Sequence, residues 1–85
     1  MLLKPILANN EIIGENVMNA CFAERLKELR LEKKIGQIQL ANEIGVSKGI
    51  ISLWENGLRE PTLSSLVLLA KFFEVSLDYL AGLID

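Results

Sequence analysis

The stretch GVSKGIISLWENG, residues 45–57, predicts a turn followed by a short helix with two different faces. At about 100° per residue, one face carries Ser47, Ile50, Ile51 and Trp54, and the opposite face carries Gly49, Ser52, Leu53 and Asn56, with Lys48 beside it. The hydroxyl of Ser47 can cap the helix, and Asn56-Gly57 supplies a left-handed stop. The first face is predicted to pack, which leaves the second face free to bind.

A second short helix is predicted immediately upstream, over residues 37–44, with apolar residues at Leu40, Ala41 and Ile44. Gly45 ends it, because glycine readily takes the turn conformation that a side chain would hinder. Ala41 is small enough to let the two helices approach closely. Two short helices that meet at one glycine form a helix-turn-helix arrangement.

Residues 37–80, QIQLANEIGVSKGIISLWENGLREPTLSSLVLLAKFFEVSLDYL, resemble the repressor and Cro class of phage and bacterial regulators, the XRE-type family. The resemblance extends over roughly residues 22–82. The matching positions are Gln37, Leu40-Ala41, Gly45-Val46-Ser47, Ile51, Trp54-Glu55-Asn56-Gly57, Pro61 and Val75-Ser76-Leu77-Asp78. The resemblance implies an all-α, five-helix domain with an N-terminal extension. It also implies a transcriptional regulator, in the first place a repressor, that binds double-stranded DNA as a homodimer with helix 47–56 in the major groove.

The resemblance assigns DNA contacts to Gln37, Ser47, Lys48, Gly49, Ser52, Leu53 and Asn56. Lys48 is the strongest candidate for a guanine or a phosphate, whereas Gln37, Ser47 and Asn56 would position the helix on the DNA backbone. Several residues depart from the family pattern, and among them Ile38, Ile50 and Leu58 add apolar character to this surface where threonine, glutamate or lysine would be ordinary. Gly49 has no side chain where the family often has a polar base reader, and Leu53 replaces a common arginine, lysine or glutamine. Leu53 or Ile50 could contact thymine methyl groups.

The family pattern also implies an ion pair between Arg30 and Glu55, which would tie the first helix to the recognition helix. Two unrelated surface charges are the alternative, and they would contribute little to stability. The expected benefit of the pair is orientation rather than net stability.

Three further helices are predicted from periodicity and capping residues, over residues 22–34, 62–73 and 76–83. Their expected core residues are Phe22, Leu26, Leu29, Leu63, Leu66, Ala70, Phe73, Leu77 and Leu80. Three apolar residues, Leu68, Phe72 and Tyr79, are surplus to this core. They are candidates for a dimer interface, unless residues 1–20 cover them.

The length of 85 residues fits one domain, and with 51% hydrophobic residues we do not expect disorder throughout; the net charge is −2. That charge argues against strong sequence-independent binding to phosphates, although seven of the nine basic residues lie between 22 and 60. The lone Cys21 excludes an intramolecular disulfide, and a cytoplasmic location is the default expectation. The sequence shows neither histidine nor a catalytic constellation, so we expect no enzymatic activity, no cofactor and no metal.

Residues 1–20 fall outside the resemblance, and we predict an extension there that is an arm, an additional helix or disordered, followed by the domain over residues 21–85. Their interrupted apolar residues are too few to span a membrane. Two alternatives to a DNA-binding regulator stay open. One is a protein-interaction or antitoxin-like module with the same fold, and the other is a family member that has lost DNA binding.

Overall fold

The computed structural model describes residues 10–85, with side chains described from residue 19 onward. This part of the chain consists of five α-helices and no strand, which confirms the all-α prediction. The helices are α1 (Asn10–Glu32), α2 (Gln37–Ile44), α3 (Lys48–Glu55), α4 (Leu63–Phe73) and α5 (Leu77–Ala81).

The first helix is longer than the segment predicted from residue 22. Its backbone runs without a break from Asn10 to Glu32, across the predicted boundary at residue 20. No proline interrupts this stretch, and the cost of about 1 kcal/mol for Gly14 does not end the helix. Residues 10–20 therefore continue α1 toward its N-terminal end, while residues 1–9 lie outside the described residues.

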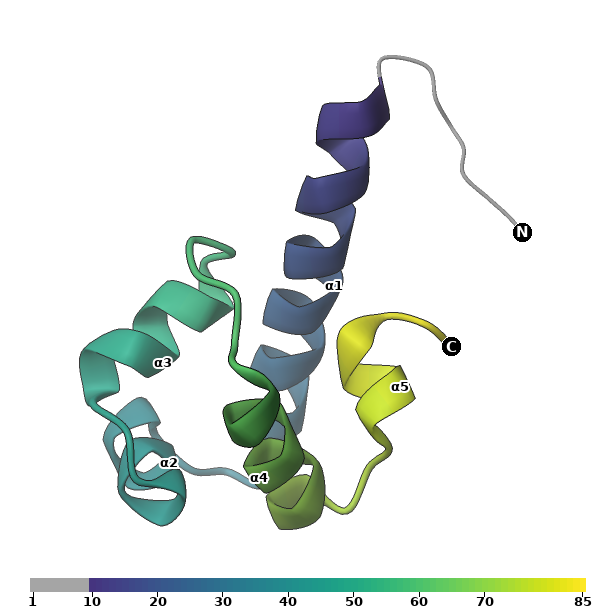
Figure 1. The fold of residues 1–85 in the computed structure, drawn as a ribbon. Coiled ribbons are helices and arrows are strands. Elements are labelled where there is room, and N and C mark those ends of the chain that lie inside the picture. Colours follow the sequence, from purple (N-terminus) through teal and green to yellow (C-terminus); the bar gives the residue numbers. More distant parts are fainter. Residues whose placement is uncertain (1–9) are drawn as a thin grey trace.

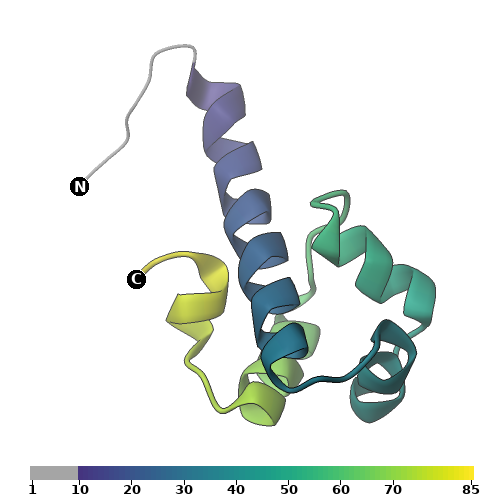
Figure 2. The same cartoon turned by 180° about the vertical axis from the view of Figure 1, so that it is seen from behind.

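Helix α1 is the central element, with α3 packed on one side of it and α5 on the other (Figure 1). Helix α2 packs against α3 and α4, and α4 packs against α5. Seen from behind, the same order holds, and the N-terminal half of α1 extends beyond the other helices (Figure 2). The helix-turn-helix pair α2 and α3 thus lies at one side of the domain, and the C-terminus lies at the other.

All five helices contribute to one hydrophobic core. Its buried members are Phe22, Leu26, Leu40, Ala41, Ile44, Ile51, Trp54, Leu69, Ala70, Phe73 and Leu80. Each large aliphatic or aromatic side chain removed from water in this way contributes about 1.5–3 kcal/mol. The recognition-helix face that was predicted to pack is anchored in this core by Ile51 and Trp54.

Two predicted core residues were wrong, because Leu63 is 69% exposed and Leu77 is 38% exposed. Each is the first residue of its helix, directly after the capping residue, and core contact begins one turn later, at Leu66 and Leu80. Leu69, which the periodicity did not select, is fully buried in their place.

Side-chain caps begin three of the helices, as predicted. The hydroxyls of Ser47, Thr62 and Ser76 accept hydrogen bonds from the backbone N–H groups of Ile50, Ser65 and Tyr79, at 3.2, 3.1 and 3.0 Å. Gly36 begins α2 without such a bond. Capping fixes where each helix starts, and so it fixes which residues of α3 lie in its first turn.

We expect Thr62→Ala to lower the free energy of unfolding by about 1 kcal/mol, because it removes the cap of α4. For a domain of this size the melting temperature should fall by roughly 4–8 °C. Ser64→Ala is the matched control, since Ser64 is exposed and lies two residues after Thr62 but makes none of the capping bonds of α4. Equal melting temperatures for the two variants would contradict the capping role of Thr62.

Candidate nucleic-acid interface

The turn between α2 and α3 is fixed by Gly45, which has a φ of +78°. Few side-chain-bearing residues adopt this left-handed conformation, which explains the glycine. The backbone N–H groups of Gly45 and Val46 both donate to the carbonyl of Ala41, at 2.9 and 3.0 Å. Val46 packs against the core, so the turn holds the two helices in one arrangement.

The two faces of α3 differ in burial as its sequence pattern indicates. Ile51 and Trp54 are buried in the core, and Ile50 is half-buried against it. The predicted DNA-contacting residues divide into two groups. Ser47, Lys48, Gly49 and Asn56 are exposed, whereas Gln37, Ser52 and Leu53 are half-buried. The most accessible part of the predicted site is therefore the first turn of α3.

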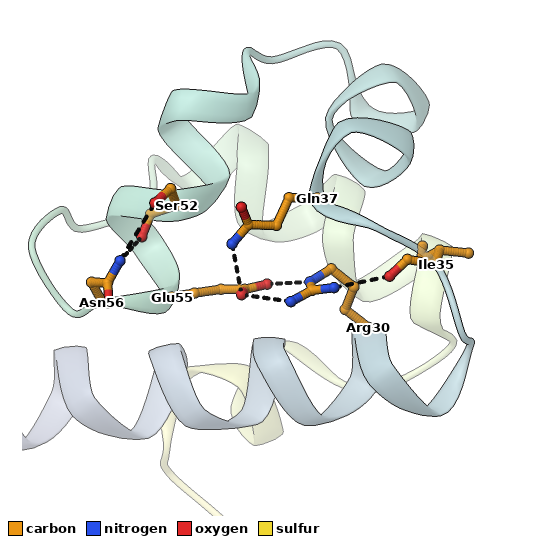
Figure 3. Close-up of polar contacts among 6 residues, drawn as sticks. All are labelled: Arg30, Ile35, Gln37, Ser52, Glu55 and Asn56. Carbon is orange, nitrogen blue, oxygen red and sulfur yellow. Dashed lines mark hydrogen bonds and ion pairs between the residues drawn. The ribbon is translucent and has the colours of Figure 1, made fainter.

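Arg30 and Glu55 lie in direct contact and connect α1 to the end of α3 (Figure 3). The guanidinium donates through Nε and Nη2 to the two carboxylate oxygens, at 2.6 and 2.9 Å. Only 10% of the Arg30 side chain and 4% of the Glu55 side chain are exposed. A bidentate pair with this little solvent contact fixes orientation as well as distance.

Two further hydrogen bonds extend this pair to the start of α2. Gln37 donates through Nε2 to the Glu55 carboxylate at 3.1 Å, and Arg30 Nη1 donates to the carbonyl of Ile35 at 2.9 Å (Figure 3). The hydrogen bond to Glu55 raises the pKa of Arg30 above its ordinary value, and this effect exceeds the lowering by burial. The guanidinium is therefore charged at any ordinary pH, and the network of Arg30, Glu55 and Gln37 joins α1, α2 and α3.

Asn56 closes α3 with its own side chain. Its amide Nδ2 donates to the carbonyl of Ser52 at 2.8 Å and approaches the Ser52 hydroxyl at 3.4 Å (Figure 3). Gly57 follows with a φ of +71°, the left-handed stop that the sequence predicts. The side chain of Asn56 therefore has a local structural role, which the sequence pattern did not indicate, and the exposed residue still lies beside the proposed contact surface.

The three dimer-interface candidates differ in exposure. Leu68 is 47% exposed, whereas Phe72 is half-buried against Phe73, with a ring-centroid separation of 4.9 Å. Tyr79 is half-buried under the guanidinium of Arg25, which lies 4.3 Å from the ring centroid. Sequence reasoning missed other exposed apolar residues near the C-terminus, namely Leu77, Leu83 and Ile84.

Sequence reasoning also missed the role of Arg25. Besides lying over the Tyr79 ring, the Arg25 side chain donates through Nη1 to the carbonyls of Tyr79 and Ile84, so one side chain of α1 contacts both α5 and the residues that follow it. Arg25 and Tyr79 are 54 residues apart in the sequence, so no local sequence pattern indicates that they are in contact.

Among the side chains that the structure describes, from residue 19 onward, no three histidine, cysteine, aspartate or glutamate residues form a cluster suited to a metal ion. None of the five helices has the length and apolar character needed to span a bilayer.

The fold and the site together define a class of protein, namely small all-α domains that present a helix-turn-helix at their surface. A family model for the helix-turn-helix matches residues 26–80, and the chain belongs to this XRE-type helix-turn-helix family.

Its relatives include a transcriptional activator and an uncharacterized transcriptional regulator. The chain is 44% identical over 59 residues to the HTH-type transcriptional activator BcrR of Enterococcus faecalis, covering 69% of this chain and 29% of that protein. It is 39% identical over 64 residues to the uncharacterized HTH-type transcriptional regulator YobD of Bacillus subtilis, covering 75% of this chain and 57% of YobD. The chain thus spans about half or less of the length of these relatives.

A solved structure supports the same arrangement of helices. The P22 c2 repressor in complex with a synthetic operator superimposes with a TM-score of 0.67 at 39% identity, covering 69% of this chain and 89% of that one.

Proposed function

We propose that the protein is a sequence-specific DNA-binding transcriptional regulator that inserts α3 into the major groove. The observation that carries this proposal is the exposed first turn of α3, with Lys48 and Gly49, on a helix that is held in place by the hydrogen-bonded network of Arg30, Glu55 and Gln37. Rigid presentation of an exposed helix lowers the cost of ordering it on binding. The P22 c2 repressor, whose structure is similar, is bound to an operator, which supports the same partner here.

Each proposed contact follows from position and chemistry. Lys48 is long, charged and exposed, so it suits a guanine edge or a phosphate. Ser47 and Asn56 at the two ends of α3, with Gln37 at the start of α2, suit the DNA backbone and would fix the position of the helix. Ser52 and Leu53 lie one turn further along α3 and suit base edges.

A homodimer on an inverted repeat is part of the proposal. One short helix reads only a few base pairs, whereas two copies bound about 34 Å apart read two half-sites. The exposed apolar residues Leu68, Leu77, Leu83 and Ile84 provide surface that self-association would cover. A monomer mass in sedimentation at high micromolar concentration, measured without DNA, would count against dimerisation before binding.

The proposed outcome of binding is repression, because a domain seated on a promoter competes with polymerase for the same duplex. The P22 c2 protein is a repressor, whereas BcrR is an activator, so the outcome needs its own test. A promoter carrying the selected site upstream of a reporter gene should lose expression when the protein is produced. A gain of expression would assign activation instead.

The proposed DNA binding is tested by incubating the protein with a randomised duplex pool at two salt concentrations and sequencing the retained DNA. We expect an enriched inverted repeat, with affinity that falls steeply as salt rises. Folded protein that retains no sequence at low salt would overturn the proposed function.

Lys48→Ala is expected to weaken binding to the selected sequence by about tenfold, within the 1–3 kcal/mol of a specific contact. If Lys48 contacts a phosphate, the slope of log affinity against log salt should also fall by about one per protomer. Lys71→Ala is the control, because it removes the same charge from an exposed position on α4. Equal losses of DNA affinity in the two variants would mean that Lys48 contributes to binding only through the net charge of the protein.

A protein partner is the second candidate, and it is favoured by two exposed apolar residues close to α2 and α3. Ile38 is 65% exposed and Leu58 is 72% exposed. Apolar association depends weakly on salt, in contrast to contacts with phosphates. A binding partner retained at high salt and lost in the variant Ile38→Ser/Leu58→Ser would favour this candidate.

A further inference from the structure

Arg25 of α1 makes three contacts with the C-terminal segment, residues 77–85. Its guanidinium lies over the ring of Tyr79, 4.3 Å from the ring centroid. Its Nη1 donates to the carbonyl of Tyr79 within α5 and, at 2.6 Å, to the carbonyl of Ile84 beyond the end of α5. A planar guanidinium can lie over a ring and donate to carbonyls at the same time. Arg25 therefore connects α1 to two separate points of the segment.

The backbone of the C-terminal segment is fixed, whereas its apolar side chains are exposed. Gly82 ends α5 with a φ of +82°, and a Cβ atom added there would lie 3.0 Å from the Cβ atom of Cys21, so the segment lies directly on α1. Leu77, Leu83 and Ile84 are nevertheless 38%, 71% and 49% exposed. A surface with an ordered backbone loses little conformational freedom when a partner covers it, and exposed apolar side chains gain from being covered.

A second copy of the chain is the partner that fits this surface. The homodimer proposed above binds an inverted repeat, so its two copies are related by a two-fold axis and meet through the same surface on each copy. Such a surface has to be complementary to itself. The exposed apolar side chains of Leu77, Leu83 and Ile84 meet this condition, because they can pack against their own copies without opposing like charges.

Helix α1 links this surface to the recognition helix. Arg30 lies five residues after Arg25 and forms the bidentate pair with Glu55 at the end of α3. At about 100° per residue, the two arginines lie about 140° apart around α1. This agrees with the positions of α3 and α5 on two sides of α1 (Figure 1). The same short stretch of α1 therefore fixes both the recognition helix and the C-terminal segment.

We propose, on the basis of the homodimeric DNA binding proposed above, that Arg25 is a positioning residue that fixes the spacing between the two half-sites. The two recognition helices of a dimer lie about 34 Å apart when their half-sites are one turn of DNA apart. In this dimer the separation depends on how the C-terminal segment, where the two copies meet, lies on α1. One additional base pair moves a half-site by about 3.4 Å, so a segment without its Arg25 contacts would accept several spacings.

Arg25→Met tests this role, because it removes the three contacts and keeps an unbranched side chain. Binding is measured by fluorescence anisotropy on one half-site of the selected sequence, on the selected inverted repeat, and on repeats whose spacing differs by one base pair. The variant should bind the single half-site as the original protein does, and the selected repeat about tenfold more weakly, because the second half-site is no longer held in reach. The original protein should prefer the selected spacing about tenfold over the altered ones, and the variant less than about threefold.

Two further variants accompany Arg25→Met. Lys27→Met is the matched control, because it removes a positive charge from an exposed position on the side of α1 that faces Asn56 and Gly57, and it should leave the spacing preference unchanged. Arg25→Lys keeps the charge but has no planar fork, so it should lose the spacing preference as Arg25→Met does. The melting temperature of each variant shows that it is folded under the conditions of the binding measurement.

An equal loss of affinity on the single half-site and on the repeat would mean that Arg25 supports folding only, and it would overturn the positioning role. So would an Arg25→Met variant that keeps the spacing preference of the original protein. If the original protein bound a single half-site as tightly as the repeat, the homodimer itself would be overturned, and the role of Arg25 with it. Failure of the original protein to select any sequence is a separate result, which would overturn the proposed function.

Discussion

Arg30→Met is expected to lower the free energy of unfolding by about 3–5 kcal/mol, because it leaves the carboxylate of Glu55 buried without its charged partner. A domain of this size has a total stability of roughly 5–10 kcal/mol, so the variant should be close to unfolding at 37 °C. Two hydrogen bonds to Glu55 and one to the carbonyl of Ile35 disappear together. Urea denaturation followed by circular dichroism measures the loss.

Two control variants show whether the loss of stability comes from an unpaired buried charge or from the removal of an arginine as such. Arg59→Met removes an exposed arginine and should change stability by less than about 0.5 kcal/mol. The double variant Arg30→Met/Glu55→Met removes both charges and should recover most of the stability, because no unpaired charge remains. If Arg30→Met alone cost less than 1 kcal/mol, the buried pair would have no part in holding α1 against α3.

The same double variant also tests what the pair does for binding. It should fold but bind the selected DNA more weakly, because Gln37 loses its acceptor and α3 loses its fixed link to α1. Orientation, rather than stability, would then be the reason for a charged pair at this place in the fold.

Local features of the fold could be predicted from the sequence because their causes are local. A serine or threonine three residues before a free backbone N–H caps a helix regardless of the rest of the chain, as Ser47, Thr62 and Ser76 do. Gly45 and Gly57 mark left-handed positions for the same kind of reason. These signals placed the ends of α3 and the starts of α4 and α5.

The buried face of α4 could be predicted only in part, because Leu66, Ala70 and Phe73 were correct whereas Leu69 was not selected. Its sequence, LSSLVLLAKFF, is apolar at most positions after its first turn, so periodicity alone does not select one face. The packing of α2 and α5 against α4 decides that Leu69 is buried while Leu63 and Leu68 are exposed. This is a long-range effect, and it explains why the periodicity did not select Leu69.

The candidate site, too, could be predicted only in part from the sequence. Residue types and spacing were sufficient to name the candidate contacts on α2 and α3, but side-chain directions were not readable. The amide of Gln37 turns toward Glu55, and that of Asn56 turns back to Ser52. The direction of each amide side chain depends on a hydrogen-bond acceptor that the fold brings near. For Gln37 that acceptor, Glu55, lies 18 residues away in the sequence.

Trp54→Ala is expected to cost about 3–5 kcal/mol of folding stability, because it opens a cavity where α3 meets α1. Trp54 is only 2% exposed, and its ring packs edge-to-face on Phe22, with a centroid separation of 5.9 Å. An edge-to-face pair adds about 0.5–1.5 kcal/mol beyond the burial of its area. The loss should appear as a shift of the urea midpoint, and DNA affinity should fall with the population of folded protein.

Trp54→Phe separates packing from hydrogen bonding at this position. The indole Nε1 of Trp54 is buried and has no hydrogen-bond partner within the described residues, so phenylalanine removes a donor that makes no bond there. Phenylalanine also keeps an aromatic ring against Phe22, and the cost should be well below that of alanine. If Trp54→Phe were as destabilising as Trp54→Ala, the indole N–H would have a bound partner, such as a buried water. In that case hydrogen bonding as well as packing would hold the recognition helix against α1.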